Sequence, residues 1–217
     1  MRVDPSLKRF AGPIFVTGGS GFIGSHVVRQ LVAMGREVRC LVLPEDRAPA
    51  LTQLNVTRVN GSLLDQHVLD DAMDGCELVI HLAALFSLWL KDASQIHRVN
   101  VEGTRRVMRA ARKNAVKRVV YTSSIAAIGH VPGQGLSDET TAFNDWHIKD
   151  DYVVSKYVSE LEALRPENLE AMDVVAVNPT FPFGPWDISP TPTGRLILTI
   201  LRGQFPFIVP GGCNAVD

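Results

Sequence analysis

The feature that most constrains the fold is the alternation of short apolar runs with longer segments of helical period. Runs rich in β-branched residues predict strands, and the segments between them carry apolar residues every three or four positions, which predicts helices. Two of the runs, LVIHLAA and RVVYTSS, are apolar without alternation, which is typical of parallel strands covered on both faces. The pattern predicts an α/β fold with a doubly wound parallel sheet. We expect strands at 14–17, 37–43, 57–60, 78–82, 118–123 and 174–178, and helices at 21–34, 66–73, 94–113, 151–164 and 195–202.

Composition and charge exclude several classes of protein. The net charge of −1 gives no general field for attracting nucleic acid or an anionic membrane. No apolar run approaches the roughly 20 residues that span a bilayer, and the first residues hold no apolar stretch long enough for a signal peptide. The cysteines Cys40, Cys76 and Cys213 are widely spaced and contain no CxxC pair. We therefore expect reduced, mostly buried thiols, no metal site, no membrane span and a cytoplasmic location.

A cluster of positive charge needs a separate explanation. Seven Lys and Arg residues lie between positions 105 and 118, a density that suggests a nucleic-acid-binding stripe. An apolar stripe at helical spacing runs through the same region, and a helix of this kind turns its charges toward solvent. We therefore expect a solvated helix face and no nucleic-acid partner. The apolar stripe consists of Ile96, Val99, Gly103, Val107, Ala110, Ala111 and Ala115.

The segment TGGSGFIG, residues 17–24, follows the first predicted strand and opens the first predicted helix. Its glycines fit two registers, Gly19-x-Gly21-x-x-Gly24 and Gly18-x-x-Gly21-x-x-Gly24, in the context that a dinucleotide-binding turn requires. The missing side chains let backbone N–H groups and the helix N-terminus approach a pyrophosphate, whereas a plain strand–turn–helix corner is the alternative. We predict a phosphate cradle, formed by Gly18, Ser20, Gly21, Phe22, Ile23 and Gly24.

The segment YVVSK places Tyr152 and Lys156 four residues apart, on one face of a predicted helix. A phenol has a pKa of about 10, and a nearby cation favours the phenolate. We therefore expect Lys156 and a bound nicotinamide to lower the pKa of Tyr152, so that this residue exchanges a proton with a substrate hydroxyl. Such pairs are common by chance, and the weight of this one comes from its place after the fifth strand.

The carboxyl end of that fifth strand carries three hydroxyl side chains in a row. Thr122, Ser123 and Ser124 each offer a hydrogen bond to a substrate oxygen, and ordinary capping of a strand end is the alternative. Further on, NPTFPFGPWDISPTPTG holds five prolines and two glycines in seventeen residues. It reads as an ordered loop at the carboxyl end of a strand, where open α/β sheets bind their ligands.

Together these motifs resemble the extended short-chain dehydrogenase/reductase superfamily, in its NAD-dependent epimerase/dehydratase group. The resemblance covers essentially the whole chain and implies a Rossmann fold. NPTFPFGPWDISPTPTGR closely resembles a loop of the hopanoid-associated sugar epimerases and dihydroflavonol 4-reductase-like proteins. The other matching segments are TGGSGFIG, GSLLD, VIHLAA, RVNVEGTRRVMRAA, VVYTSSIAAIG and YVVSK.

The resemblance implies a role for each matching position. Tyr152 is the acid–base residue, Lys156 its electrostatic partner and ribose ligand, and Ser124 the residue that holds the substrate oxygen. His81 is expected to be a packed residue at a strand end. The segments 94–113 and 151–164 are expected to pair with their mates in a homodimer. The remaining cofactor contacts are Leu64 and Asp65 at adenine, Ala83 and Ala84 at the nicotinamide ribose, Asn100 as support, and Pro179 and Thr180 beside the nicotinamide.

One departure from the family pattern concerns the choice of cofactor. At the end of the second strand the family carries an Asp for NAD or an Arg for NADP, and this chain has Leu43. Arg39 or Arg47 can reach a 2′-phosphate, whereas Glu45 or Asp46 can accept a ribose hydroxyl. Because no acid occupies the expected place, we expect NADP rather than NAD, with Arg47 as a ligand.

The other departure is the ending FIVPGGCNAVD, which has no evident closing element, whereas family members usually continue. We expect a cofactor-binding domain over 1–178 and, over 179–217, the start of a truncated substrate-binding portion that leaves apolar surface exposed. The implied function is an NAD(P)-dependent oxidoreductase or epimerase that transfers hydride at a hydroxyl or ketone centre. A cofactor-binding module without turnover is the alternative. The substrate stays open between a sugar nucleotide, a flavonoid-like or steroid-like ketone and a lipid-linked alcohol.

Overall fold

A computed structural model of the chain describes residues 9–86, 92, 94–133, 135–205, 212 and 214–216. Its centre is a six-stranded, fully parallel sheet with the strand order β3-β2-β1-β4-β5-β6. The order reverses direction between β1 and β4, which is where doubly wound sheets bind their ligands. The predicted fold is confirmed, and each strand lies within one residue of its expected bounds. The strands are β1 (Ile14–Thr17), β2 (Val38–Val42), β3 (Thr57–Asn60), β4 (Leu78–His81), β5 (Arg118–Thr122) and β6 (Asp173–Val177).

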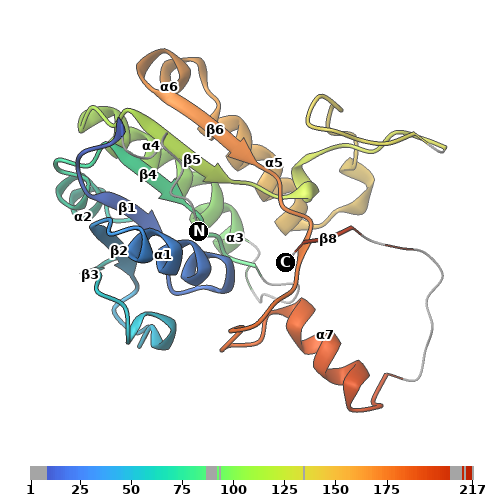
Figure 1. Cartoon of the computed structure of the whole chain (residues 1–217). Coiled ribbons are helices and arrows are strands. Elements are labelled where there is room, and N and C mark those ends of the chain that lie inside the picture. The colour runs from blue at the N-terminus through green and yellow to red at the C-terminus, as the bar shows by residue number, and fades with distance from the viewer. Residues whose placement is uncertain are drawn as a thin grey trace.

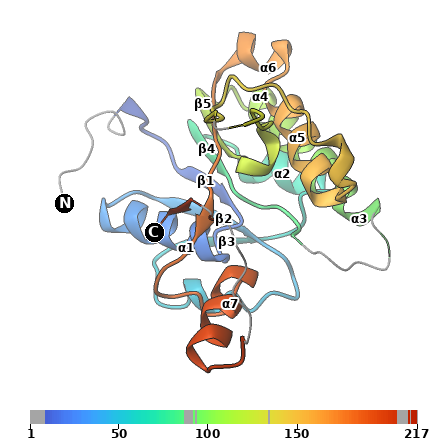
Figure 2. The same ribbon diagram turned by 90° about the vertical axis from the view of Figure 1, so that its right-hand side faces the viewer.

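Helices cover both faces of the sheet. Figures 1 and 2 show α1 on one face and α2, α4 and α5 on the other, with α7 apart from the sheet. Helix α6 is an element that the sequence analysis did not anticipate. The helices are α1 (Phe22–Ala33), α2 (Gln66–Ala72), α3 (Ser94–His97), α4 (Gly103–Lys113), α5 (Asp151–Ala163), α6 (Pro166–Ala171) and α7 (Pro192–Leu201).

The alternation of side chains along β1 divides the core in two. Ile14 and Val16 point toward α1, where they pack with Val28 and other residues of one buried cluster. Phe15 points to the opposite face, into a second cluster with side chains of α2, α4 and α5. All four residues of β1 are buried, as expected of a central strand with both faces covered.

The segment expected as one helix over 94–113 contains a change of helical type. A π-helical segment, Arg98–Glu102, separates α3 from α4. π-Helical turns are rare and often occur at functional sites, and this one holds the buried Asn100. The expected apolar stripe is confirmed, with Ile96, Gly103 and Val107 among its buried residues. Ala115 is an exception, since it lies beyond the end of α4 in a left-handed conformation and is exposed.

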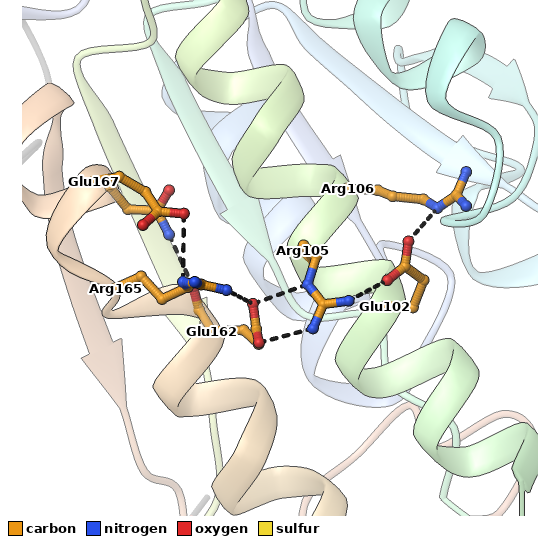
Figure 3. Close-up of polar contacts among 7 residues, drawn as sticks. Glu102, Arg105, Arg106, Glu162, Arg165 and Glu167 are labelled. Atoms are coloured by element: carbon orange, nitrogen blue, oxygen red, sulfur yellow. Dashed lines mark hydrogen bonds and ion pairs between the residues drawn. The ribbon is translucent and has the colours of Figure 1, made fainter.

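Five of the seven basic residues of this region pair with acids, so they do not form a free cationic stripe. Arg105 and Arg106 of α4 both bind Glu102, the last residue of the π-helical segment, and Arg105 also reaches Glu162 of α5 (Figure 3). The expectation of a merely solvated face is therefore only partly correct. Further pairs join Lys113 to Asp70, Lys117 to Glu77 and Arg118 to Asp173.

The end of the chain contains a closing element that the sequence analysis did not predict. Ala215–Val216 forms β8, which pairs in parallel with β7 (Phe181–Pro182). Helix α7 starts at Pro192 rather than at Arg195, and its first turn is capped by the side chain of Thr191. None of its residues is buried, which agrees with the expectation of exposed apolar surface in this region.

The two described cysteines are free, buried thiols, as expected. Burial raises the pKa of Cys40 to about 12 and that of Cys76 to about 11. Cys213 lies outside the described residues. Within the described ranges, no helix is both long and apolar enough to cross a membrane, and no group of three or more His, Cys, Asp or Glu side chains is placed to hold a metal ion.

Candidate active site

The glycines after β1 differ in how closely other atoms approach the place of a Cβ. Gly18 has a φ of 72°, and a Cβ there would lie 2.6 Å from the backbone nitrogen of Ala83. A Cβ at Gly24 would lie 2.0 Å from the carbonyl oxygen of Gly18. Packing alone therefore excludes side chains at both positions. Gly21 differs, because its φ is −75° and the nearest atom to a Cβ there is the Gly18 oxygen at 3.3 Å.

The N-terminus of α1 lacks the side-chain cap that α2, α5 and α7 have. Asp65, Asp150 and Thr191 cap α2, α5 and α7 with side-chain oxygens, whereas the cap residue of α1 is Gly21 and makes no such bond. The first-turn N–H groups and the positive end of the helix dipole thus face a position without a Cβ. This arrangement fits the pyrophosphate of a dinucleotide, since it supplies both donors and space.

The end of β4 closes against the glycine-rich turn. The N–H of Ala83 donates to the hydroxyl of Thr17 at 3.2 Å, and the N–H of Leu82 donates to the carbonyl of Thr17 at 3.1 Å. Ala83 is half-buried and Ala84 exposed, so both border the turn from the next strand. The carboxyl ends of β1 and β4 thereby form one edge of the site.

Asn100 supports the site from the π-helical segment. Its side-chain amide is buried and binds the backbone of Leu85 in both directions, accepting from the N–H at 2.7 Å and donating to the carbonyl at 3.0 Å. It also donates to the hydroxyl of Ser155 on α5 at 2.9 Å. Asn100 therefore ties the segment after β4 to the helix that carries Tyr152.

Tyr152 is fixed at the start of α5 by a helix cap. The carboxylate of Asp150 accepts hydrogen bonds from the N–H groups of Tyr152 at 2.8 Å and Val153 at 3.2 Å. The ring of Phe86 packs edge-on against the ring of Tyr152, with 4.5 Å between the centroids. The cap could have been found in the sequence, because an Asp directly precedes the helical segment.

Of the three hydroxyl candidates after β5, Ser124 is the one that meets Tyr152. Its hydroxyl lies close enough to Tyr152 to lower the pKa of that phenol, and it accepts from the N–H of Ala126 at 3.1 Å. The hydroxyl of Ser123 is buried and has no hydrogen-bond partner in the described part of the chain. The loop after β6 meets the same strand end, since the carbonyl of Pro179 accepts from the N–H of Ile125 at 3.1 Å. Thr180 follows it and is half-buried.

The pKa of Tyr152 shifts in the direction opposite to the expected one. Burial raises it and the carboxylate of Asp150 adds to the rise, while the hydrogen bond with Ser124 lowers it. Lys156 is not among the groups that shift this pKa, because its ammonium is directed toward two other oxygens. Its Nζ donates to the carbonyl of Thr122 at 2.9 Å and to the hydroxyl of Tyr121 at 3.3 Å. Burial lowers the pKa of Lys156 to about 8.

The residues expected at adenine lie near the start of α2. One carboxylate oxygen of Asp65 caps this helix, accepting from the N–H groups of His67 and Val68, so its second oxygen is the one left for a ligand. The carbonyl of Leu64 accepts from the guanidinium of Arg106 at 2.7 Å. These bonds fix the turn between β3 and α2.

The structure separates the candidate ligands of a 2′-phosphate. Arg39 donates to the carbonyls of Ala72 and Asp74, so the suggestion that it reaches a phosphate is wrong. Arg47 is exposed in the loop after β2 and is held through its backbone carbonyl by Arg58. Arg47 therefore stays the candidate, beside the exposed Leu43.

The model of the NAD dependent epimerase/dehydratase family matches residues 14–215 of this chain, so the chain belongs to that family. A protein of Synechocystis sp. named a putative dihydroflavonol 4-reductase is 45% identical over 204 residues, which cover 94% of this chain and 59% of that protein. Sterol demethylase protein B of Methylococcus capsulatus is 39% identical, over 93% of this chain and 61% of that protein. A 3β-hydroxysteroid dehydrogenase/Δ5→4-isomerase of Mycobacterium tuberculosis is 32% identical, over 95% and 56%.

Solved structures show the same fold. The crystal structure of gox2253 has a TM-score of 0.87 and 39% identity, and the match covers 95% of this chain and 62% of that one. DesIV, a dTDP-glucose 4,6-dehydratase of Streptomyces venezuelae with NAD and TYD bound, has a TM-score of 0.76 and 27% identity, over 88% and 62%. The chain thus spans about 60% of the length of the relatives it matches.

Proposed function

Because the chain belongs to the NAD dependent epimerase/dehydratase family, we propose that it transfers hydride at a hydroxyl or ketone centre, with Tyr152 as the acid–base residue. The resemblance that the sequence motifs indicated is confirmed at the level of the family. The observation that carries the proposal is the meeting of Ser124 and Tyr152 beside the buried Lys156, at the same sheet edge as the uncapped helix α1. Net reduction, net oxidation and epimerisation all use this arrangement.

The cofactor in this proposal lies along the carboxyl edge of the sheet. Backbone N–H groups of the glycine-rich turn hold its pyrophosphate, with Ala83, Ala84, Pro179 and Thr180 around the nicotinamide and Leu64 and Asp65 at the adenine. When bound, the nicotinamide accepts or supplies the hydride. NAD is the cofactor bound in DesIV, whereas the exposed Arg47 and the absence of an acid at Leu43 favour NADP here.

The chain's own residues handle the proton. The hydroxyls of Ser124 and Tyr152 bind the substrate oxygen, and the phenol gives its proton to that oxygen in reduction or removes it in oxidation. The ammonium of Lys156 stabilises the phenolate that remains, provided that it is charged. Burial keeps the pKa of Tyr152 high in the empty protein, so the phenol holds its proton until a substrate arrives.

The substrate we propose is a ketone or alcohol on an apolar ring system. Three of the relatives are named for a dihydroflavonol, a sterol and a 3β-hydroxysteroid. The ring of Phe86, which is 42% exposed and lies edge-on against Tyr152, gives this edge of the site an apolar wall. An apolar wall favours a ring system over the hydroxyl-rich face of a sugar. The homodimer and the cytoplasmic location stay predictions.

Turnover of a substrate panel tests this proposal. We would assay steroid-like ketones, flavonoid-like ketones and sugar nucleotides with NADPH and NADH, in wild type, Tyr152→Phe and Tyr157→Phe. We expect turnover of a ring ketone, a loss of about 100-fold or more in Tyr152→Phe, and little change in Tyr157→Phe, which keeps the ring stacked on Phe143. Unchanged turnover in Tyr152→Phe would contradict the acid–base role. Cofactor binding without turnover on any substrate would favour a binding module.

A further inference from the structure

The ammonium of Lys156 is anchored by two protein oxygens. Its side chain is buried at the carboxyl end of β5, and it donates to the carbonyl of Thr122 at 2.9 Å and to the phenol of Tyr121 at 3.3 Å. An ammonium has three N–H donors. Among the described residues these two oxygens are its hydrogen-bond acceptors, which leaves one donor for a bound molecule. The position of that donor depends on the two anchors.

The hydrogen bonds around Tyr121 determine which way its own proton points. The hydroxyl of Ser159 donates to the carbonyl of Lys156 at 3.1 Å. Since Ser159 has used its one proton, it must accept in its 2.7 Å bond with Tyr121, and the phenol is the donor. The lone pairs of the phenol oxygen are therefore available to Lys156. Burial raises the pKa of Tyr121 to about 12, so the phenol stays protonated and uncharged.

The same phenol is connected to the glycine-rich turn. The ring of His81 packs against that of Tyr121 with 5.5 Å between the centroids, and Nε2 of His81 lies 3.0 Å from the hydroxyl of Thr104 on α4, a group that lowers the pKa of Tyr121. Nδ1 of His81 lies 2.7 Å from the hydroxyl of Thr17, the residue before Gly18. Burial lowers the pKa of His81 to about 3, so the imidazole is neutral and carries one proton. Thr17, His81 and Thr104 are all buried.

These bonds form one continuous, oriented chain. With the imidazole proton on Nε2, Thr17 donates to His81 and His81 donates to Thr104, whose own proton is then available to the phenol of Tyr121. The chain then continues through Ser159 to the backbone of Lys156. Every hydroxyl in it donates once, and no donor faces another donor.

We propose that Tyr121 is a positioning residue of the site, and that its hydroxyl, held by Ser159 while its ring packs on His81, fixes the ammonium of Lys156 relative to the glycine-rich turn. The inference rests on the proposed function, because Lys156 is proposed to act on Tyr152 and on the cofactor. The hydrogen bonds that anchor Lys156 do not depend on any substrate.

The expected consequence is a change in the protonation of Lys156. The titratable groups that face its ammonium are Tyr121 from β5, His81 from β4 and Glu160 from its own helix. Glu160 raises the pKa of Lys156, and its carboxylate is held at 2.8 Å by the side chain of Asn178. In Tyr121→Phe the ring stays and the acceptor is lost, so the charged form loses one hydrogen bond. The pKa of Lys156 should fall by about one unit.

The test is a titration of the unliganded full chain, labelled with ¹³C-lysine and followed by NMR at the Cε position. The signal is assigned with Lys156→Met. We expect the pKa of Lys156 to fall in Tyr121→Phe and to stay within about 0.2 units of wild type in Tyr157→Phe, a tyrosine adjacent to Lys156 that stacks on Phe143 instead. Ser159→Ala removes the acceptor of the phenol proton, so it should shift the pKa in the same direction by a smaller amount.

An unchanged pKa of Lys156 in both Tyr121→Phe and Ser159→Ala would overturn the proposal. If Tyr121→Phe does not fold, Ser159→Ala decides alone, because it removes one hydroxyl without touching the aromatic core. Calorimetry with NADH then separates this inference from the proposed function. A shifted lysine pKa in a protein whose wild type binds no nicotinamide would keep the anchoring of Lys156 and refute the function.

Discussion

His81 lies at the end of β4 between two threonine hydroxyls, 2.7 Å from Thr17 and 3.0 Å from Thr104. It is 1% exposed, and burial lowers its pKa from 6.5 to about 3. At a pH between these two pKa values, His81 binds a proton in the unfolded chain but not in the folded chain. Folding stability contributed by this residue is therefore complete above about pH 6.5 and falls as the pH is lowered toward 3.

This residue should make the protein sensitive to mild acid. Between pH 7 and pH 5 the uptake of this proton by the unfolded chain removes about 2 kcal/mol of unfolding free energy. In His81→Gln this decrease of about 2 kcal/mol between pH 7 and pH 5 should disappear, although we expect the variant to be less stable than wild type at pH 7. Urea unfolding at the two pH values measures the difference, with the exposed His67→Gln as control. Equal losses in wild type and His81→Gln would show that His81 is protonated in the folded state.

At the scale of elements, helices α4 and α5 are joined by a bidentate ion pair. The two carboxylate oxygens of Glu162 accept from Arg105 at 2.8 and 3.1 Å, and one of them also accepts from Arg165 at 3.2 Å (Figure 3). The side chain of Glu162 is 13% exposed and that of Arg105 is 50% exposed. The hydrogen bond from Arg105 holds the pKa of Glu162 below its usual value.

Removing this charge should weaken the contact between α4 and α5. We expect Glu162→Gln to lower the free energy of unfolding by about 1 kcal/mol at pH 7, the upper end for a partly exposed pair. The pair stabilises the fold above the unfolded pKa of Glu162, and this contribution is lost as the pH falls through the lower folded pKa. The difference between wild type and variant should therefore vanish in acid. Glu167→Gln, which removes a single 3.3 Å contact at an exposed side chain, should change stability by less than about 0.5 kcal/mol.

The whole molecule distributes its apolar residues unevenly. Two buried clusters lie on the two faces of the sheet, around β1, β2 and β4. At the edge strand β6, Val175 and Val177 are exposed, and α7 exposes Ile200 and, to 77%, Leu201. Figure 2 shows this helix below the sheet rather than against it. The part of the chain that carries the site is therefore the well-packed part, and residues 179–217 stay proposed as the start of a substrate-binding portion.

The parts of the fold that could be predicted are those that depend on residues close together in the sequence. The strands, α1 and α5 follow from local periodicity and composition, so their bounds agree with the structure within a few residues. The pairing of Ala215–Val216 with Phe181–Pro182 joins segments more than thirty residues apart, and two-residue strands carry no periodicity. The π-helical segment results from burying Asn100 against Leu85 and α5, which no local pattern reveals.

In the candidate site too, features that depend on local sequence could be predicted, and features that depend on distant contacts could not. The glycines, YxxxK and the serine run are local signals, so Gly18, Tyr152 and Ser124 could be proposed as candidates from the sequence. Tyr121 was missed, because within an apolar strand a tyrosine is indistinguishable from a packing residue. The direction of the pKa shift of Tyr152 was also missed, since it depends on burial and on where the ammonium of Lys156 points.

The central claim is that the turn after β1 holds the phosphates of a dinucleotide, and Gly21→Ala tests it most directly. The added Cβ would lie 3.3 Å from the carbonyl oxygen of Gly18, a tight contact that a shift of a few tenths of an ångström relieves. We therefore expect the free energy of unfolding to fall by no more than about 1 kcal/mol relative to wild type. Gly24→Ala is the contrasting variant, because its Cβ would lie 2.0 Å from a carbonyl oxygen and the fold itself should suffer.

The measurement is calorimetric titration of wild type and Gly21→Ala with NADPH and NADH. We expect micromolar binding by wild type, tighter for NADPH, and a loss of at least about tenfold in Gly21→Ala at nearly unchanged stability, since the methyl group would occupy the place of the pyrophosphate. Equal affinity in wild type and Gly21→Ala, or no binding of either nucleotide by wild type, would mean that the glycines serve only the packing of α1 against the sheet.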